Sequence, residues 1–447
     1  MRKTIKNVGR KEIEPIVAKS CTKAVEELKK RRITALYDDG SEKEYRIDFE
    51  MEALEEAMRL EKIKELSIPK KYRVRGKAIV PEYDEILVPQ RADPYVLHTE
   101  DGWYYFTASY PVRGLHENEQ GIGYDRIVLR RARTIVGLRD AEEITIWHQK
   151  DSSRLHRYIW APELHCINGC YYILFTGSVE EKNVWGIRPH MLKCVGTDLM
   201  NPDCWRMEEE ANLHRVTALS SDVTSFTHFS LDMTCFEHRG TYYVIWAEIP
   251  EDKSNLYIAS VDKNEPWKLN SEAVLLATPE YQWEMQGNVK VNEGPIVLKR
   301  GGKIYVAFSA SATDYTYCVG MLEIDENQDL LDETAWKKHS YPLLTSENFQ
   351  NQCGPGHNSF TVDENGNVVM IYHARPYECS NAMDKYGHYG KCEYVEEGQS
   401  PLSDPCRHAR AKSINFVADG TPILHLTSDE ELKWEYRTIE IEVIIQE

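Results

Sequence analysis

The chain has 447 residues, of which 42% are hydrophobic, so it can bury a sizeable core in one large domain with an appendage or in two to three ordinary domains. This composition excludes extensive disorder. The formal net charge of −18 opposes binding to nucleic-acid phosphates and to anionic membrane surfaces, so neither partner is expected.

Targeting and redox features are few in this sequence. The N-terminal stretch MRKTIKNVGRKEIEPIV has basic residues but no apolar run of signal-peptide length, and no later apolar run is long enough to span a bilayer. A cytoplasmic location is therefore expected. The 11 Cys residues follow no regular spacing, which favours reduced thiols over a disulfide framework.

Residues 1–76 differ from the rest of the chain in their density of Lys and Glu. Residues 11–32 and 48–67 combine helix-forming composition with helical spacing of apolar residues. Between them, the sequence around Asp39-Gly40 predicts a β-hairpin. We expect a small α+β appendage here and assign it no chemistry.

From residue 80 onward, one hairpin pattern recurs five times. Each copy has a turn glycine followed by aromatic or β-branched residues, and the glycines are separated by 67, 71, 62 and 64 residues: Gly102, Gly169, Gly240, Gly302 and Gly366. A turn repeated at near-constant period is typical of four-stranded blades around an axis. The sequence therefore predicts an all-β fold, a five-bladed β-propeller over residues 77–425, with residues 426–447 as a C-terminal strand or tail.

The strand before each turn glycine is expected to be the innermost strand of its blade. Stepping back eight or nine residues from each glycine reaches the start of that strand, at Asp93, Ala161, Asp232, Glu293 and His357. Equivalent positions on inner strands converge on the axis of a propeller. Three carboxylates and one imidazole are therefore expected at one mouth of the central channel.

A carboxylate at the start of a strand often only caps a turn. Three at the same repeat position are harder to explain in this way, because gathered like charges repel one another and lose stability on burial. Such clusters suit either metal binding or acid/base hydrolysis of a glycosidic bond. Nearby aromatic residues favour a sugar, whose apolar faces stack on rings: Trp103, Trp160, Phe229 and Trp246.

At these motifs the sequence resembles glycoside hydrolase family 43, and most closely its exo-acting α-L-arabinofuranosidase branch. The matching stretches together cover roughly residues 80–425: Ala92-Asp-Pro-Tyr-Val, Tyr124-Asp-Arg-Ile-Val-Leu-Arg-Arg-Ala, Ile159-Trp-Ala-Pro-Glu-Leu-His, Ser230-Leu-Asp, Val291-Asn-Glu-Gly-Pro, Ser309-Ala-Ser-Ala-Thr-Asp, Gly354-Pro-Gly-His-Asn-Ser-Phe and Asp404-Pro-Cys-Arg-His. The family fold is a five-bladed propeller, which the repeat indicates independently.

The resemblance implies roles for the three carboxylates. Asp93 corresponds to the general base that activates water, and Glu293 to the general acid. Asp232 corresponds to the third carboxylate, which orients the acid and raises its pKa. Glu163 competes with Asp232 for this third role, because related branches place a carboxylate in the Trp-Ala-Pro motif. The resemblance also implies inversion of configuration, with water between the base and the sugar.

Further residues are candidates for holding the sugar: Trp160, Glu163, Phe229 and Arg407, with Arg410 as the alternative arginine. His357 matches a family histidine at the channel centre that in some members supports a calcium ion through water. A plain hydrogen-bonded imidazole is the alternative for His357. No cofactor is expected to be required, with a structural calcium in the central channel left open.

The sequence departs from the branch pattern in three insertions: residues 111–123, 207–228 and 378–403. Loops between blades form the walls of the active site, so these insertions put the choice of substrate in doubt. The third insertion carries Cys379, His388 and Cys392, followed by Cys406 and His408, but without zinc-site spacing, so loose thiols are expected.

The expected function is an inverting glycosidase that releases terminal α-L-arabinofuranosyl residues from oligosaccharides of plant cell-wall arabinan or arabinoxylan. The nearest alternative is a β-D-xylosidase of the same family. A glycoside phosphorylase would need a cluster of cations and no carboxylate base, and a non-catalytic sugar-binding propeller would use equivalent sites in several blades. The sequence gives no oligomeric state.

Overall fold

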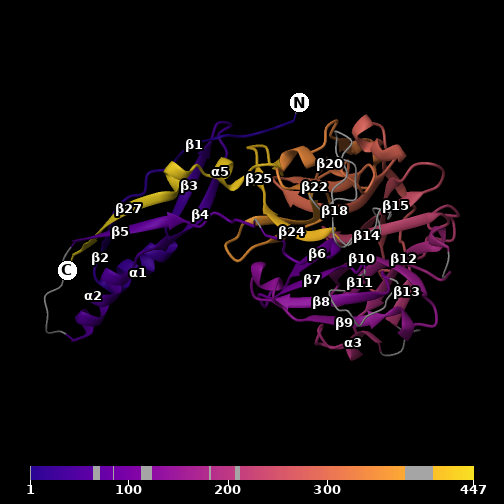
Figure 1. Ribbon diagram of the computed structural model, residues 1–447, viewed down its shortest axis with the longest axis horizontal. Helices are drawn as coiled ribbons and strands as arrows, with labels where there is room; N and C mark the ends of the chain where they lie inside the picture. Colours follow the sequence, from indigo (N-terminus) through magenta and orange to yellow (C-terminus); the bar gives the residue numbers. More distant parts are fainter. Residues whose placement is uncertain are drawn as a thin grey trace. The chain divides into compact units, whose positions relative to one another are not determined.

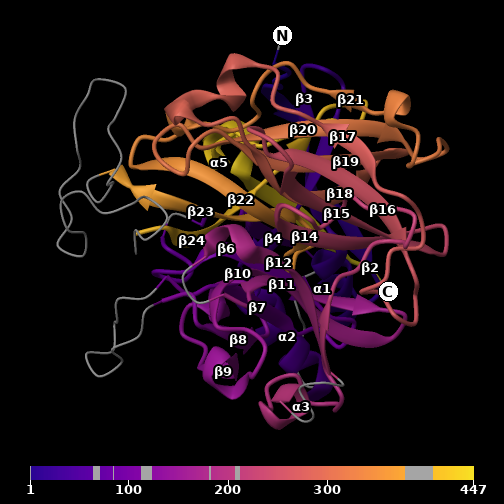
Figure 2. The same cartoon turned by 90° about the vertical axis from the view of Figure 1, so that its right-hand side faces the viewer.

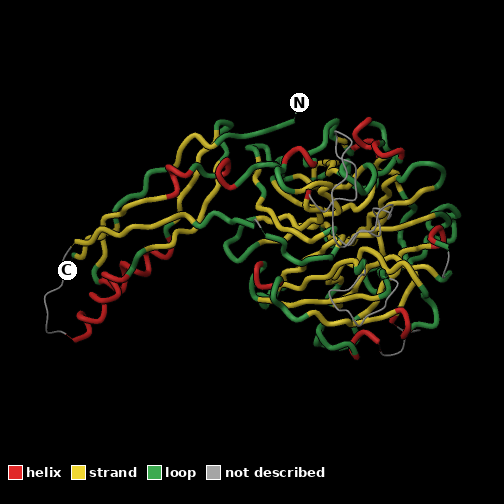
Figure 3. The backbone as a smooth tube through the Cα atoms, viewed as in Figure 1, coloured by secondary structure: helices red, strands yellow, loops and turns green. Residues whose placement is uncertain are grey.

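The computed structural model divides the chain into two compact units. It describes residues 2–63, 71–83, 85–111, 123–180, 183–206, 212–377 and 406–446. Unit 1 holds Arg2 and Tyr83–Lys412, and unit 2 holds Lys3–Glu82 and Ser413–Glu447. Strands and loops dominate unit 1, whereas unit 2 also contains the two longest helices (Figures 1 and 3).

Unit 1 is built from five antiparallel sheets that follow one another along the chain (Figures 1 and 2). Four have four strands each, and the described part of the fifth has three. Their strands are β6 (Ala92–His98), β7 (Tyr104–Ser109), β8 (Arg126–Ala132) and β9 (Glu143–His148); β10 (Arg157–Ile167), β11 (Cys170–Ser178), β12 (Ile187–Lys193) and β13 (Leu213–Arg215); β14 (Phe229–His238), β15 (Thr241–Ile249), β16 (Asn255–Val261) and β17 (Val274–Ala277); β18 (Asn292–Arg300), β19 (Lys303–Ala310), β20 (Cys318–Asp325) and β21 (Lys337–Lys338); and β22 (Gln352–Val362), β23 (Val368–Pro376) and β24 (His408–Ser413).

The turn glycines of the repeat join the first and second strands of these sheets. In three sheets a two-residue turn has positive φ at both positions, as in Asn168 (φ 49°) followed by Gly169 (φ 79°). Such turns match the right-handed twist of the strands and favour glycine at the second position. The five hairpins predicted from the sequence are therefore confirmed.

The first strands of the sheets contact one another in a cyclic order. β6 contacts β10, β10 contacts β14, β14 contacts β18, β18 contacts β22, and β22 contacts β6. The apolar cores lie between neighbouring sheets, as where Val96 and Phe106 of the first sheet pack in one cluster with Val369 and Ile371 of the fifth. Each such buried side chain contributes about 1.5–3 kcal/mol of hydrophobic stabilisation.

Unit 2 is a six-stranded sheet with helices packed on it. The strand order is β1-β3-β4-β5-β27-β2, and the C-terminal strand β27 runs antiparallel to β5 and parallel to β2. The elements are β1 (Asn7–Arg10), β2 (Ile16–Ala18), α1 (Cys21–Lys30), β3 (Arg32–Tyr37), β4 (Glu42–Phe49), α2 (Glu52–Ile63), β5 (Lys71–Ala78) and β27 (Thr438–Ile445), with short β25 (Asn415–Phe416), β26 (Pro422–Ile423), α5 (Ser428–Glu431) and α6 (Trp434–Arg437).

The two chain ends meet in one sheet. Residues 426–447 contain a strand, as expected: β27 pairs with β5 and so belongs to the same sheet as the N-terminal strands. The first helix begins only at Cys21, after β2, because Ser20 caps it: the Ser20 side chain accepts a hydrogen bond from the Lys23 N–H. The α+β character of the N-terminal segment and its hairpin at Gly40 are as expected.

None of the helices in the described ranges combines the length and the apolar character needed to cross a bilayer.

Candidate active site

A β-bulge interrupts the inner strand of every sheet near its start. The pairing register shifts between residues 92 and 95, 160 and 163, 231 and 234, 293 and 296, and 356 and 359. The second residue of each bulge has a positive φ between 43° and 54°: Asp93, Ala161, Asp232, Gly294 and His357. These five residues are therefore structurally equivalent.

The register corrects the sequence alignment of the fourth sheet. Glu293 lies one residue before the position of Asp93 and Asp232, and Gly294 takes that position. The alignment is one residue out because Gly301-Gly302 forms a two-residue turn. For such a turn the equivalent position lies eight residues before the turn glycine, and not nine. Two features favour glycine at position 294. Its φ is +54°, and a Cβ there would lie 3.2 Å from the His357 ring.

The backbone N–H of each bulge residue is bound by a side chain of the preceding sheet or strand. Ala161, Asp232 and His357 donate to Ser109 Oγ (2.7 Å), Thr176 Oγ1 (3.4 Å) and Ser309 Oγ (2.6 Å), in that order. In the first sheet, Asp93 N–H donates to His373 Nδ1 of the fifth sheet at 3.1 Å. These contacts fix the backbone from which the site's side chains project.

In the fourth sheet, the N–H of the bulge residue binds the Asp232 side chain instead. The residue that would accept from Gly294 is Ala247, which has no polar atom in its side chain. Gly294 N–H instead donates to Asp232 Oδ2 at 3.0 Å. The Asp232 carboxylate is thereby held beside the start of β18, which carries Glu293.

Asp93 lies in a buried cationic environment. Arg407 Nη1 is 3.2 Å from Asp93 Oδ1, and His357 Nδ1 is 3.4 Å from the same oxygen. Burial alone would raise the pKa of Asp93, but His357 and Arg407 hold this pKa well below its usual range. Asp93 is therefore ionised near neutral pH.

The pKa values of Asp232 and Glu293 are raised, in contrast to that of Asp93. Burial raises the pKa of Asp232, Glu293 and Asp93 raise it further, and His357, 3.8 Å away, opposes them. Burial also raises the pKa of Glu293, which Tyr317 and His357 oppose. Two buried carboxyls that repel each other titrate as a pair, so the pair retains a proton to higher pH than an ordinary carboxyl.

Tyr317 and His373 are functional candidates that the sequence reasoning missed. Tyr317 Oη donates to Glu293 Oε1 at 2.7 Å, and its ring stacks on His373 with centroids 5.5 Å apart. Burial lowers the pKa of His373 to about 3, so its neutral Nδ1 can accept from Asp93 N–H. A signal for His373 existed, because the residues seven after each turn glycine are Ser109, Thr176, Ala247, Ser309 and His373. Tyr317 carries no such signal.

Two of the predicted sugar-binding residues, Arg407 and Trp160, contact Tyr124 beside the carboxylate cluster. Arg407 lies in the cluster: besides Asp93, it contacts Tyr124, donating from Nη2 to the phenol oxygen at 2.6 Å. The alternative, Arg410, donates to Ala374 O at 3.4 Å instead. Trp160 packs edge-on against Tyr124, with centroids 5.8 Å apart, and against Phe229 at 6.5 Å.

Glu163 lies further along the inner strand and is engaged elsewhere. Its Oε2 is 2.7 Å from His165 Nε2. Two other aromatic candidates have structural roles: Trp246 is fully buried, and the Trp103 ring stacks under the Arg133 guanidinium at 3.7 Å.

The comparisons with known proteins now identify the family. The model of glycosyl hydrolases family 43 matches residues 84–422. The chain belongs to this family.

Curated relatives and solved structures agree with this membership. The chain is 38% identical over 345 residues to α-L-arabinofuranosidase 43 of Humicola insolens, covering 76% of this chain but 62% of the relative, so the match leaves over a third of that relative unmatched. It is 42% identical over 298 residues to an extracellular exo-α-(1→5)-L-arabinofuranosidase of Streptomyces chartreusis, covering 66% of this chain and 83% of the relative. The crystal structure of an α-L-arabinofuranosidase from Lactobacillus brevis superposes with a TM-score of 0.61 at 35% identity, covering 77% of this chain and 98% of that one. The relatives give no support to the cytoplasmic location expected from the sequence, since the S. chartreusis protein is named extracellular.

A structural calcium supported by His357 through water, which the resemblance to family 43 left open, stays a prediction. Within the ranges that the structure describes, no group of three or more His, Cys, Asp and Glu side chains could hold a metal ion. His357 Nδ1 is directed at Asp93 and Asp232.

The insertions expected to wall the family 43 site fall largely outside the described residues. This applies to 112–122 of the first insertion, to 207–211 of the second and to the whole of 378–403, with Cys379, His388 and Cys392. Cys406 and His408 are described and buried, and His408 Nδ1 accepts from Gln90 N–H at 2.8 Å.

Proposed function

We propose that this chain is an inverting, exo-acting α-L-arabinofuranosidase that removes terminal arabinofuranosyl residues from oligosaccharides of arabinan or arabinoxylan. The observation that carries the proposal is the pairing, in one cluster, of an ionised carboxylate with a pair of carboxyls that retains a proton. Glycosidic hydrolysis needs one carboxyl in each state. The names of relatives at 36–42% identity support the arabinofuranoside over the xyloside.

Asp93 acts as the general base in this mechanism. Its carboxylate, ionised beside Arg407 and His357, accepts a proton from water as the water oxygen bonds to the anomeric carbon. Arg407 also orients Asp93 and, with Tyr124, lines the sugar position next to it.

Glu293 acts as the general acid and donates its proton to the leaving glycosidic oxygen. Burial and the repulsion between Asp232 and Glu293 raise the proton affinity of the pair, and the Asp232 carboxylate is oriented by Gly294 N–H. Because Tyr317 donates to Oε1 of Glu293, the transferable proton belongs on Oε2. The acid is thus poised with one defined oxygen toward the substrate.

We also propose that unit 1 is a closed five-bladed propeller with the site at one mouth of its channel. The cyclic contacts of β6, β10, β14, β18 and β22 support closure, as does the hydrogen bond from Asp93 N–H to His373. Base and acid then lie in the first and fourth blades, with the fifth between them. This separation leaves room for water and supports inversion.

The experiment that tests the function is a panel of 4-nitrophenyl glycosides and linear and branched pentose oligosaccharides with identification of the products. Release of arabinose from the non-reducing end, with the arabinofuranoside hydrolysed faster than the β-D-xyloside, is expected. Faster hydrolysis of the xyloside would reassign the chain to the xylosidase alternative. Turnover that depends on phosphate would indicate a phosphorylase.

A further inference from the structure

Trp185 is an exposed aromatic residue to which the proposed mechanism assigns no role. It lies in the short helix η3 (Val184–Gly186) between β11 and β12, and 63% of its surface is exposed. Because β11 ends opposite the start of β10, with Ser178 paired to Arg157, the loop that carries Trp185 lies at the same end of the sheet as Ala161 and the catalytic cluster.

A continuous series of rings connects Trp185 with the catalytic carboxylates. Tyr124, which binds Arg407, contacts Trp160 at 5.8 Å between centroids; Trp160 contacts Phe229 at 6.5 Å, and Phe229 contacts Trp185 at 5.2 Å. Phe229 stands three residues before Asp232 on β14. An elongated substrate whose terminal sugar lies against Asp93 can therefore follow these rings outward.

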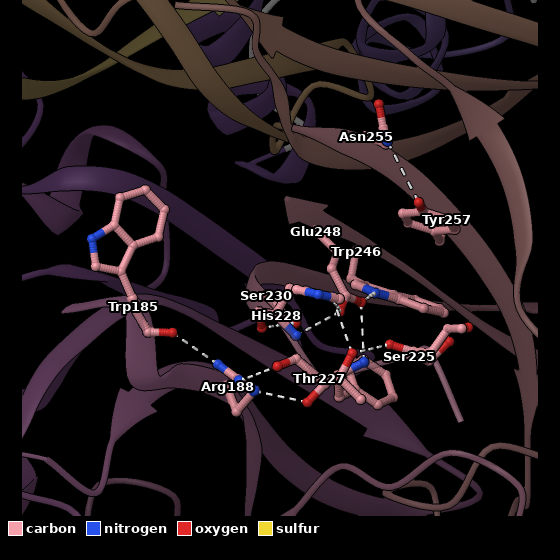
Figure 4. A network of polar contacts seen from close by, with 12 residues as sticks. Trp185, Arg188, Ser225, Thr227, His228, Ser230, Trp246, Glu248, Asn255 and Tyr257 are labelled. Atoms are coloured by element: carbon pink, nitrogen blue, oxygen red, sulfur yellow. Dashed lines mark hydrogen bonds and ion pairs between the residues drawn. The ribbon is translucent and has the colours of Figure 1, made fainter. Parts of the chain in front are cut away.

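Arg188 fixes the backbone on both sides of this contact (Figure 4). Its guanidinium donates to Trp185 O at 3.0 Å, to Phe226 O at 2.7 Å and to Thr227 O at 2.6 Å. Burial lowers the pKa of Arg188, and these three carbonyl oxygens, together with Ile187 O at 2.6 Å, accept from its guanidinium. Arg188 thus ties the Trp185 helix to the segment that leads directly into Phe229.

Glu248 holds the same segment from its other side. Its carboxylate, 3% exposed, accepts from Phe226 N–H at 3.1 Å, from His228 N–H at 3.2 Å and from Trp246 Nε1 at 3.1 Å. Burying a carboxylate to bind loop amides is unfavourable unless all its hydrogen bonds are made. An exposed tryptophan with no binding role would not require a buried carboxylate to order the loop beside it. In Figure 4 the Trp185 indole extends away from this network.

We propose that Trp185 and Phe229 form a stacking subsite for a neutral pentose ring on the leaving-group side of the cleaved bond. This inference rests on the proposed function. Both rings are rigid and apolar, and the Trp185 indole also carries an N–H at its edge. Such rings pack against the C–H face of a sugar at little entropic cost. The loop network holds the subsite in shape before substrate arrives.

Two substrates separate the subsite from the catalytic centre. α-1,5-Arabinotriose has sugars beyond the cleaved bond, whereas methyl α-L-arabinofuranoside has a leaving group too small to reach Trp185. In Trp185→Ala, the ratio of kcat/KM for arabinotriose to kcat/KM for the methyl glycoside should fall about tenfold, mainly through KM. Trp185→Phe, which keeps a ring, should restore most of the ratio.

Trp434→Ala is the matched control, because Trp434 is 66% exposed and belongs to unit 2. Its ratio should equal that of the unaltered protein. An unchanged ratio in Trp185→Ala, or an equal loss on both substrates, would overturn the subsite.

Binding distinguishes failure of this inference from failure of the proposed function. In Glu293→Gln, which cannot donate the catalytic proton, calorimetry with arabinotriose measures binding alone. Adding Trp185→Ala to this variant should weaken binding about tenfold. If arabinotriose binds and Trp185 matters but nothing is hydrolysed by the unaltered protein, the proposed activity fails while the subsite stands. Equal affinity with and without Trp185 refutes the subsite, whatever the activity.

Discussion

Replacing Tyr317 by Phe removes one hydroxyl group from beside the general acid and leaves the ring in place. The stacking of this ring on His373 is retained, so the backbone around Asp93 should not move. The replacement abolishes the 2.7 Å hydrogen bond from Tyr317 Oη to Glu293 Oε1. Tyr317→Phe therefore changes the environment of the proposed acid while keeping the packing around it.

The size of the effect follows from this hydrogen bond. A bond to an ionised carboxylate is worth about 1.5–3 kcal/mol, and one pKa unit corresponds to about 1.4 kcal/mol. Tyr317 donates to both forms of Glu293 but binds the ionised form more strongly, by about 1–1.5 kcal/mol. The bond therefore lowers the pKa of Glu293, and its loss should raise this pKa by about one unit. The acid must be protonated to work, so activity is lost as pH rises through this pKa. Tyr317→Phe should therefore extend activity to higher pH.

The assay is the pH profile of kcat/KM on an arabino-oligosaccharide, whose poor leaving group requires the acid. The alkaline limb should move upward by about one pH unit, while the acid limb stays in place. Tyr372→Phe is the control, since Tyr372 is also a buried tyrosine but donates to Gln352 at 3.1 Å. An alkaline limb that stays in place or moves to lower pH in Tyr317→Phe would refute the assignment of Glu293 as the acid.

Four further outcomes are expected. Glu293→Gln should lose most activity on oligosaccharides but far less on a dinitrophenyl arabinofuranoside, and equal losses on both would contradict its role. Asp93→Ala should be inactive without azide rescue, and proton NMR of the first product from the unaltered enzyme should show inverted configuration; retention would make Asp93 a nucleophile. Lys338→Met should lower the free energy of unfolding in urea by about 3 kcal/mol, because the buried Glu284 carboxylate loses its cation, 2.6 Å away, and keeps only N–H donors. Lys268→Met, at an exposed pair, should change it by less than about 1 kcal/mol. A chelator should leave turnover unchanged, and a loss that added metal restores would reassign the carboxylates as ligands.

Much of the site could be predicted because the repeat is a local property of the sequence. Turn glycines occur where the backbone of the turn needs a positive φ, so Gly102 and its counterparts mark the hairpins without any tertiary information. The count back to the site failed by one residue in the fourth sheet because it depends on turn length. A one-residue error moves a side chain to a different position in the bulge, and only the pairing register resolves it.

Other features could not be predicted because they depend on contacts between distant segments. Tyr317 reaches Glu293 from the start of a different strand, and no spacing in the sequence connects the two. Similarly, nothing in residues 438–445 indicates that they pair with β5, more than 350 positions earlier, since an amphipathic strand fits many sheets. Arg407 was found only through the family resemblance, and its contact with Asp93 gives that assignment a physical reason.

The position of β27 has a consequence for how the chain folds. This strand fills the gap between β5 and β2, so the sheet of unit 2 cannot be completed until residues 438–445 have left the ribosome. Until then, the facing edges of β2 and β5 present unpaired backbone groups, the kind of edge that invites pairing with another chain. Unit 1, whose pairings are nearly all between consecutive strands, can form during synthesis. The order of events is therefore inverted relative to the sequence: residues 7–78 are made before unit 1, but their sheet is completed only after residues 438–445, which follow unit 1.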